Sequence, residues 1–236
     1  TDIVLERSRT TFAATPIEPF AAKGKTEPVR ASAIGAVEGT READRSRTPL
    51  IGRETELDAM LHVVEQARGG QGWVVEIAGA AGLGKSRLVD EVIARSPDVT
   101  VLRARCEEYE ASTPYFPLRA LMRSVLGVER DDGPEETERR LREVVERGDP
   151  GLVAWVPLLG ILLGLDLADT PETAALDERF LRERLGEVTM QFLFTLLAGT
   201  PTMIAVEDVH CMDEASRDLL LRLARANAEL RHVILV

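Results

Sequence analysis

The segment Trp73–Ala94, WVVEIAGAAGLGKSRLVDEVIA, joins an apolar stretch to a helical pattern through a loop with three glycines and a lysine. Gly79, Gly84, Lys85 and Ser86 satisfy the spacing G-x-x-x-x-G-K-[ST], which is typical of a phosphate-binding loop. The glycines let successive backbone N–H groups turn inward around phosphates, and the helix that follows directs its positive end toward them. An incidental glycine-rich turn between a strand and a helix is the alternative.

This spacing predicts a nucleotide site with a magnesium ion. Lys85 is expected to reach the terminal phosphates and to act in catalysis, and Ser86 is expected to ligate Mg²⁺. The predicted nucleotide-binding residues of the loop are Gly79, Ala80, Ala81, Gly82, Leu83, Gly84, Lys85, Ser86 and Arg87.

A magnesium nucleotide also needs an acidic partner at the end of a neighbouring apolar strand. The stretch MIAVED provides Glu207 and Asp208 after four apolar residues. Neighbouring strand residues point to opposite faces, so the two acids can share a role only if the strand ends between them. We assign Glu207 to the metal and Asp208 to the attacking water, with a solvated carboxylate pair as the alternative. Aspartate is one methylene shorter than the glutamate usual at the second position, which predicts slow hydrolysis because water attack demands close geometry.

The order of apolar and helical patterns predicts an α/β fold of the P-loop NTPase type, with a three-layer arrangement around a parallel sheet. A helical insertion is expected at about 106–201, between the second and third strands. The predicted strands are 73–78, 99–105, 202–207 and 232–236, and the helices beside them are 85–94 and 213–230.

The first 35 residues read as two strands joined at a turn, with Gly24 at the bend. Residues 36–48 are charged and small, which is linker composition. We therefore predict a hairpin at 1–35, a linker at 36–48 and an ATPase core at 49–236 that is truncated at its C-terminal end. Folds that this pattern resembles place the first strand between the fourth strand and a fifth one, which would lie beyond residue 236, so we expect one sheet edge to be uncovered.

The composition limits the classes of partner. There are 29 Lys and Arg against 40 Asp and Glu, a net charge of −11 that repels nucleic acid and anionic membranes. The apolar stretch 151–165 is too short to span a bilayer, and we expect a buried helix pair or a helical turn there. The two cysteines, Cys106 and Cys211, lie far apart and give no disulfide framework, so the expected location is cytoplasmic.

Four segments in order resemble the ATPase module of the STAND class, the signal-transduction ATPases with numerous domains. They are PLIGRETEL (49–57), GAAGLGKSRL (79–88), RCEEYEASTPYFPLRALM (105–122) and VEDVHCMDEAS (206–216). The resemblance covers residues 49–236 and implies ATP and Mg²⁺ as ligands.

The same resemblance places Arg53 near the base and ribose; a helix-start residue is the alternative. His210 either senses the terminal phosphate or packs beside the strand end, and Cys211 stands where the family usually has tryptophan. We expect Asp213 to cap the following helix, and Cys106 and Cys211 to be small buried residues rather than a redox pair.

The segment 16–35, PIEPFAAKGKTEPVRASAIG, resembles the final hairpin of a class III adenylate or guanylate cyclase domain. Lys23 or Lys25 could correspond to a lysine that approaches the substrate phosphates in that family, although a solvated hairpin lysine is favoured. The metal-binding carboxylates of a cyclase are absent from this sequence, so we expect no cyclase activity from the chain itself.

Together these features predict an ATP-binding, slowly hydrolysing regulatory switch within a multidomain signalling protein, with a cyclase as its output. The expected partners are ATP and the attached cyclase and C-terminal helical domains, with no direct nucleic acid contact and no membrane. The sequence leaves open whether the chain forms a homo-oligomer. The alternatives are the ATPase module of a helix-turn-helix transcriptional regulator and a nucleotide-binding scaffold without turnover.

Overall fold

The computed structural model describes residues 10–22, 28–40, 50–107, 113–129, 131–230 and 232–235. The chain divides into two compact units, residues 1–49 and residues 50–236, and each is considered by itself.

The first unit contains a hairpin of two antiparallel strands, β1 (Thr10–Phe20) and β2 (Val29–Thr40). The predicted pair of strands is therefore present, while Gly24, Lys23 and Lys25 lie outside the described residues. Ile17, Phe20 and Ile34 are exposed. A two-stranded hairpin with exposed apolar side chains buries little surface of its own.

Strand β2 continues five residues into the range 36–48 that its composition had suggested to be a linker. Backbone pairing extends to Thr10 opposite Thr40 and Thr11 opposite Gly39, with register shifts along the ladder. Pairing of this kind uses backbone N–H and C=O groups, so a stretch with few apolar side chains can still form a strand when a partner strand lies beside it. Residues 41–49 are outside the described part.

The second unit is built on a four-stranded sheet in the order β3-β6-β5-β4. Its strands are β3 (Trp73–Val75), β4 (Thr100–Arg105), β5 (Thr202–Glu207) and β6 (Val233–Leu235). All three neighbouring pairs are parallel, as predicted. In the described part of the sheet, the first strand in sequence lies beside the fourth and at the edge, and this order agrees with the expected one.

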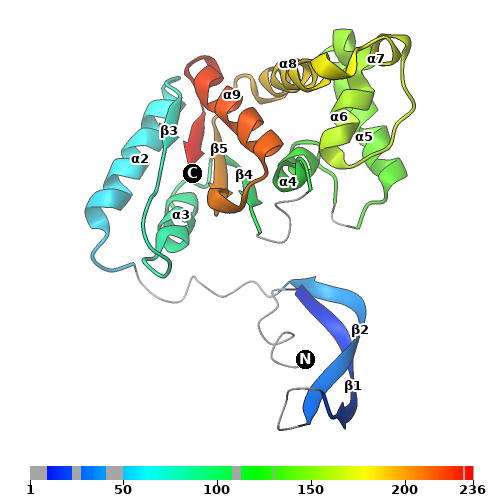
Figure 1. Cartoon of the computed structure of the whole chain (residues 1–236). Helices are drawn as coiled ribbons and strands as arrows, with labels where there is room; N and C mark the ends of the chain where they lie inside the picture. The colour runs from blue at the N-terminus through cyan, green and yellow to red at the C-terminus, as the bar shows by residue number, and fades with distance from the viewer. Residues whose placement is uncertain are drawn as a thin grey trace. The chain divides into compact units, whose positions relative to one another are not determined.

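Helices cover both faces of this sheet (Figure 1). On one face lie α2 (Glu54–Arg68) and α3 (Lys85–Ala94). On the other lie α4 (Phe116–Val125) and α9 (Glu214–Leu230), with the rest of the insertion beyond them. The remaining helical elements are α5 (Pro134–Gly148), η3 (Pro150–Trp155), α6 (Val156–Leu163), α7 (Pro171–Ala174), α8 (Glu178–Leu197) and η4 (Val209–Cys211).

The three-layer α/β arrangement follows from strand alternation. In β5, Met203 and Ala205 join the apolar cluster under α2 and α3, while Ile204 and Val206 join the cluster under α4, α8 and α9. The apolar stretch 151–165 forms η3 and α6, whose buried residues include Leu152 and Leu162, so it is a buried helical turn and helix as expected. Alternate residues of the strands therefore supply two cores, one on each face.

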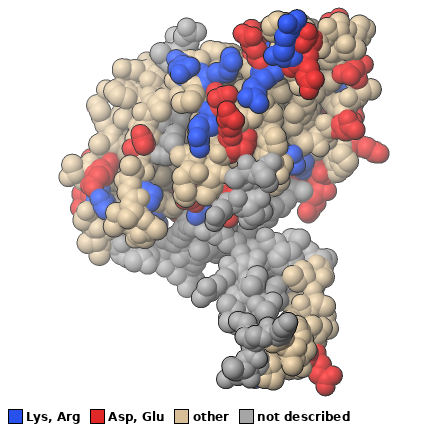
Figure 2. Space-filling view, viewed as in Figure 1, with Lys and Arg blue, Asp and Glu red and all other residues tan. Residues whose placement is uncertain are grey.

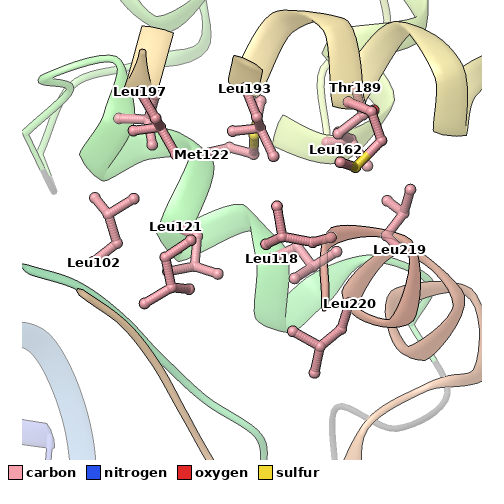
Figure 3. A pocket seen from close by; sticks show the side chains of 14 residues that line it. Leu102, Leu118, Leu121, Met122, Leu162, Thr189, Leu193, Leu197, Leu219 and Leu220 are labelled. Atoms are coloured by element: carbon pink, nitrogen blue, oxygen red, sulfur yellow. The ribbon is translucent and has the colours of Figure 1, made fainter. Parts of the chain in front are cut away.

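A small apolar cavity of about 40 Å³ remains where the insertion packs on the sheet (Figure 3). Leucines from β4, α4, α6, α8 and α9 surround it, among them Leu102, Leu118 and Leu162. The one polar side chain in its lining is Thr189, whose hydroxyl donates to the Leu185 carbonyl at 2.7 Å. The cavity therefore offers no unsatisfied polar group to a water molecule.

The charged residues of the insertion form local pairs of opposite sign. On α5, Arg139 Nε donates to Glu136 Oε2 at 2.8 Å and Arg142 Nη2 donates to Glu138 Oε1 at 2.8 Å. In Figure 2, the Lys and Arg atoms on the visible face lie beside Asp and Glu atoms. Within the described ranges, no helix combines the length and apolar character needed to cross a membrane.

Candidate functional site

The glycine-rich loop lies between β3 and α3, as the sequence predicts. The strand is shorter than the predicted 73–78, because its pairing with β6 runs from Trp73 opposite Val233 to Val75 opposite Leu235 and leaves Glu76–Ala78 in the loop. Gly82 and Gly84 have φ values of 82° and 80°, a conformation that side chains other than glycine's rarely adopt. A Cβ atom at either glycine would meet no atom within 4 Å, so backbone conformation and not lack of space selects glycine there.

Lys85 is the first residue of α3 and closes the loop on itself. Its Nζ donates to the Gly79 carbonyl at 2.8 Å and to the Ala80 carbonyl at 3.0 Å. Its side chain borders the cavities described next. The ammonium group is thus placed at the centre of the loop, where a phosphate group could replace the two carbonyls as its hydrogen-bond acceptor.

Two cavities of about 430 Å³ each adjoin this loop. They share the lining residues Glu76, Ile77, Ala78 and Lys85, so both lie against the same part of the loop. The first is bordered by the sequence-predicted residues Gly79, Ala81, Lys85, Ser86, Glu207 and Asp208 together with His210. The second is bordered by Arg53, Leu83, Gly84 and Lys85 and by the apolar side chains of Met60, Val75, Ile77 and Leu88.

The predicted metal ligands Ser86 and Glu207 are brought into direct contact. The Ser86 hydroxyl donates a short hydrogen bond to Glu207 Oε2, across 121 positions of sequence. The Glu207 side chain is only 9% exposed. Burial by itself would raise the pKa of Glu207, but the hydrogen bonds from Ser86 and Arg103 and the nearby arginine charges hold it below its ordinary value. Glu207 is therefore an anion that could accept a cation at this position.

Asp208 follows Glu207 directly after the end of β5. Its backbone is in the left-handed region, with φ 57° and ψ 39°, so the strand direction is lost at this residue. Its carboxylate forms an ion pair with Arg105 Nη2 at 2.9 Å, and its side chain is 37% exposed. The strand thus ends between the two acids, so strand alternation does not by itself separate their roles. Their contacts differ: Glu207 is buried against Ser86, whereas Asp208 is more exposed and pairs with Arg105.

Two arginines on β4 contact this acid pair and were not anticipated from the sequence. Arg103 contacts Glu207 and Arg105 contacts Asp208. Arg103 also contacts Asp90 on α3. The alternation Arg103-Ala104-Arg105 in a predicted strand could have signalled two arginines on one face, but not which strand lay beside them.

Of the remaining predicted residues, some border a loop cavity and others do not. Arg53 borders the second cavity, where its Nη1 forms an ion pair with Glu56 at 2.6 Å. Arg87 borders neither cavity, and its Nη2 lies 3.3 Å from Glu91 one turn along α3. Gly82 likewise borders neither cavity.

The acidic motif continues into a capped helix. His210 and Cys211 lie in η4, His210 at the border of the first cavity and Cys211 half-buried against the insertion core. Asp213 Oδ1 accepts from the Ser216 N–H at 2.9 Å, which is the predicted cap of α9. The same oxygen accepts from the Tyr115 N–H at 3.3 Å, where Tyr115 has a φ of 62°. Asp213 thereby joins the acidic motif to the start of α4.

The donors that the chain provides here suit magnesium with a nucleotide. A hydroxyl and a carboxylate are oxygen ligands of the kind that Mg²⁺ prefers, and this ion keeps several waters or phosphate oxygens in its shell. Among the described residues, no group of three or more His, Cys, Asp or Glu could hold a metal by itself. The Ser86 hydroxyl and the Glu207 carboxylate are the oxygen donors that fit such an ion.

Comparisons with known proteins agree with this geometry. Residues 49–236 match the family described as AAA ATPase domain. The chain is also 33% identical over 184 residues to an uncharacterized protein of Rhizobium meliloti (strain 1021). That match covers 77% of this chain but only 18% of the Rhizobium protein, so the chain spans less than a fifth of that relative's length.

Proposed function

The chain belongs to the AAA ATPase domain family, and on this premise we propose that residues 49–236 form an ATP-binding, slowly hydrolysing switch of the STAND class. Membership implies the use of a nucleotide and magnesium in general. The observation that carries the proposal is the contact between Ser86 and Glu207 beside Lys85, in a cavity that opens next to Asp208.

Each residue of the site has a distinct role in this proposal. The phosphates of ATP lie along the loop, with Lys85 at the terminal phosphate in place of its present carbonyl partners. The base lies toward the second cavity, which offers apolar side chains and Arg53. Bound magnesium supplies positive charge at the phosphate oxygens. Ser86 and Glu207 are its ligands on the protein side.

Asp208 is the base that orients the attacking water. Its ion pair with Arg105 holds the carboxylate at the border of the first cavity and neutralises part of its charge. A carboxylate held against a guanidinium group is less free to take up the close geometry that water attack demands, which supports slow turnover. A slow ATPase suits a switch because the bound state lasts long enough to favour one domain arrangement over another.

Two substitutions test the assignment. Lys85→Ala should weaken ATP binding at least about tenfold, because the charge that meets the terminal phosphates is lost. Asp208→Asn should keep ATP binding within about threefold and lower phosphate release by about a hundredfold or more. Binding is measured with a fluorescent ATP analogue and turnover by phosphate release. The control is Arg142→Gln, which removes a surface ion pair with Glu138 on α5 and should change neither quantity.

The outcomes separate the competing functions. If the unmodified chain releases phosphate no faster than Lys85→Ala, the chain is a nucleotide-binding scaffold without turnover. Full turnover in Asp208→Asn would remove Asp208 from the base role. Failure of the unmodified chain to bind ATP would reject the nucleotide site itself.

The output of the switch is proposed to be a cyclase. The support is the resemblance of residues 16–35 to a cyclase hairpin, together with the hairpin that β1 and β2 form in this segment, on which Ile17, Phe20 and Ile34 are exposed. The test uses the parent protein with and without Lys85→Ala. Cyclic nucleotide formation that responds to the substitution supports the proposal, whereas specific DNA binding by a parent without cyclase activity supports a transcriptional regulator. Light scattering in the same experiment reports whether the parent is a homo-oligomer.

A further inference from the structure

Arg103 lies between two carboxylates that belong to different elements. Its Nη1 contacts Asp90 Oδ1 on α3 at 2.7 Å, and its Nε donates to Glu207 Oε1 at 2.8 Å. Its side chain is 38% exposed, against 19% for Asp90 and 9% for Glu207. One guanidinium group thus balances two acids, and one of those acids is the carboxylate proposed to ligate magnesium.

The sheet register explains this placement. Strands β4 and β5 are parallel, with Arg103 opposite Ala205 and Arg105 opposite Glu207. Alternation puts Arg103 on the face covered by α3, since Leu102 and Ala104 belong to the opposite core. From this face the Arg103 side chain reaches Glu207, which lies two positions beyond Ala205 on β5. It also reaches Asp90 on α3.

Both carboxylate oxygens of Glu207 are engaged. Oε2 accepts from the Ser86 hydroxyl, and Oε1 accepts from Arg103. A cation that approaches Glu207 therefore meets a guanidinium group already bound to the same carboxylate. Like charges repel, and the repulsion is greater where the site is half-buried than in bulk water.

Resting on the proposed function, we infer that Arg103 competes with magnesium for Glu207 and thereby sets the magnesium affinity of the site. Arg103 is a positioning residue: it contacts the carboxylate and not the substrate. When the cation binds, Arg103 keeps its ion pair with Asp90, so the guanidinium group retains a partner. Without nucleotide phosphates the protein side has little affinity for the ion, and the metal is recruited together with the triphosphate.

Arg103→Gln and Asp90→Asn shift the magnesium affinity in opposite directions. Arg103→Gln removes the competing charge, and the Mg²⁺ concentration that gives half of the full effect on nucleotide binding should fall about tenfold. Asp90→Asn removes the second partner of Arg103 and leaves the guanidinium group to Glu207, so that concentration should rise. Arg103→Lys keeps the charge and should remain within about threefold of the unmodified chain.

The measurement is a titration of MgCl₂ at a fixed concentration of fluorescent ATP analogue, with the whole 236-residue chain. Nucleotide affinity without magnesium should change less than about twofold in every variant, because Arg103 borders neither loop cavity. Arg142→Gln is the matched control, since it removes another arginine from a salt bridge. If the role of Arg103 were purely structural, Arg103→Gln would lower thermal stability and leave the Mg²⁺ concentration at half effect unchanged.

The inference is overturned if Arg103→Gln needs as much magnesium as the unmodified chain or more. Should Arg103→Gln fail to fold, a magnesium requirement in Asp90→Asn that does not rise overturns it as well. An unmodified chain that binds no ATP rejects the proposed function instead, so the two failures are distinguishable.

Discussion

Replacing Asn227 with alanine should destabilise the second unit through the strand that leads into the phosphate-binding loop. Asn227 is 1% exposed near the end of α9. Its Nδ2 donates to the Trp73 carbonyl at 2.8 Å and to the His232 carbonyl at 2.9 Å, and its Oδ1 accepts from the His232 N–H at 3.3 Å. One side chain thus joins α9 to the starts of β3 and β6.

The size of the effect follows from these three bonds. A hydrogen bond contributes about 1 kcal/mol net, and a buried donor left without a partner costs about 1–3 kcal/mol. The His232 carbonyl keeps its bond from the Trp73 N–H at 2.8 Å, and the Trp73 carbonyl stays within the parallel pairing of β3 with β6. The His232 N–H therefore loses most, and the other two bonds are lost at about 1 kcal/mol each. Asn227→Ala should therefore lower the free energy of unfolding by about 3–5 kcal/mol. For a unit of this size, that corresponds to a fall in Tm of roughly 6–20 °C.

The assay is urea and thermal unfolding followed by circular dichroism. The control is Gln191→Ala. It removes an exposed hydrogen bond of 2.7 Å from Gln191 Nε2 to Asp149 Oδ2 and should lower the free energy of unfolding by less than about 1 kcal/mol. Hydrogen exchange should also become faster at β3 in Asn227→Ala. A loss of less than about 1 kcal/mol in Asn227→Ala, or an equal loss in the control, would refute the reasoning.

Three further predictions concern the rest of the second unit. Burial lowers the pKa of His232 below its ordinary 6.5, so the unfolded chain binds more protons than the folded chain near this pH. The free energy of unfolding should therefore fall as pH drops through about 6.5. In urea titrations between about pH 5 and pH 7, His232→Leu should flatten this dependence. Leu162→Ala should cost about 2–5 kcal/mol in the same urea assay, because it enlarges a dry cavity among close-packed leucines; an unchanged midpoint would contradict the packing shown in Figure 3. Asp213→Ala removes the α9 cap and the bond from Tyr115, and a loss of about 1–2 kcal/mol is expected by thermal unfolding, with Asp213→Asn closer to the unmodified chain.

Local patterns were sufficient to predict the elements that carry the site. Helix α3 spans the predicted residues 85–94, and β5 spans the predicted residues 202–207. The phosphate-binding loop depends on glycine conformations and on a lysine at a set distance along the chain, and both are properties of a short segment. The cap at Asp213 is local for the same reason.

Element boundaries were less predictable where pairing decides them. The stretch 73–78 reads as one strand, yet β3 ends at Val75, where its pairing with β6 ends. Residues 36–40 read as linker, yet they form the end of β2 opposite β1. In both cases pairing with a partner strand decides which described residues belong to a strand, and the composition of a single segment does not report its partner.

The sequence by itself therefore determined the phosphate-binding loop and the acid pair, because each is encoded by residues close together in the chain, and the order of strand and helix patterns predicted a parallel α/β sheet. Only the tertiary structure decided how these parts meet. Ser86 contacts Glu207 across 121 positions, and Arg103 reaches the same carboxylate across 104. The first contact depends on the placement of α3 beside the end of β5, and the second on the register of β4 against β5. No local preference of a single segment specifies either.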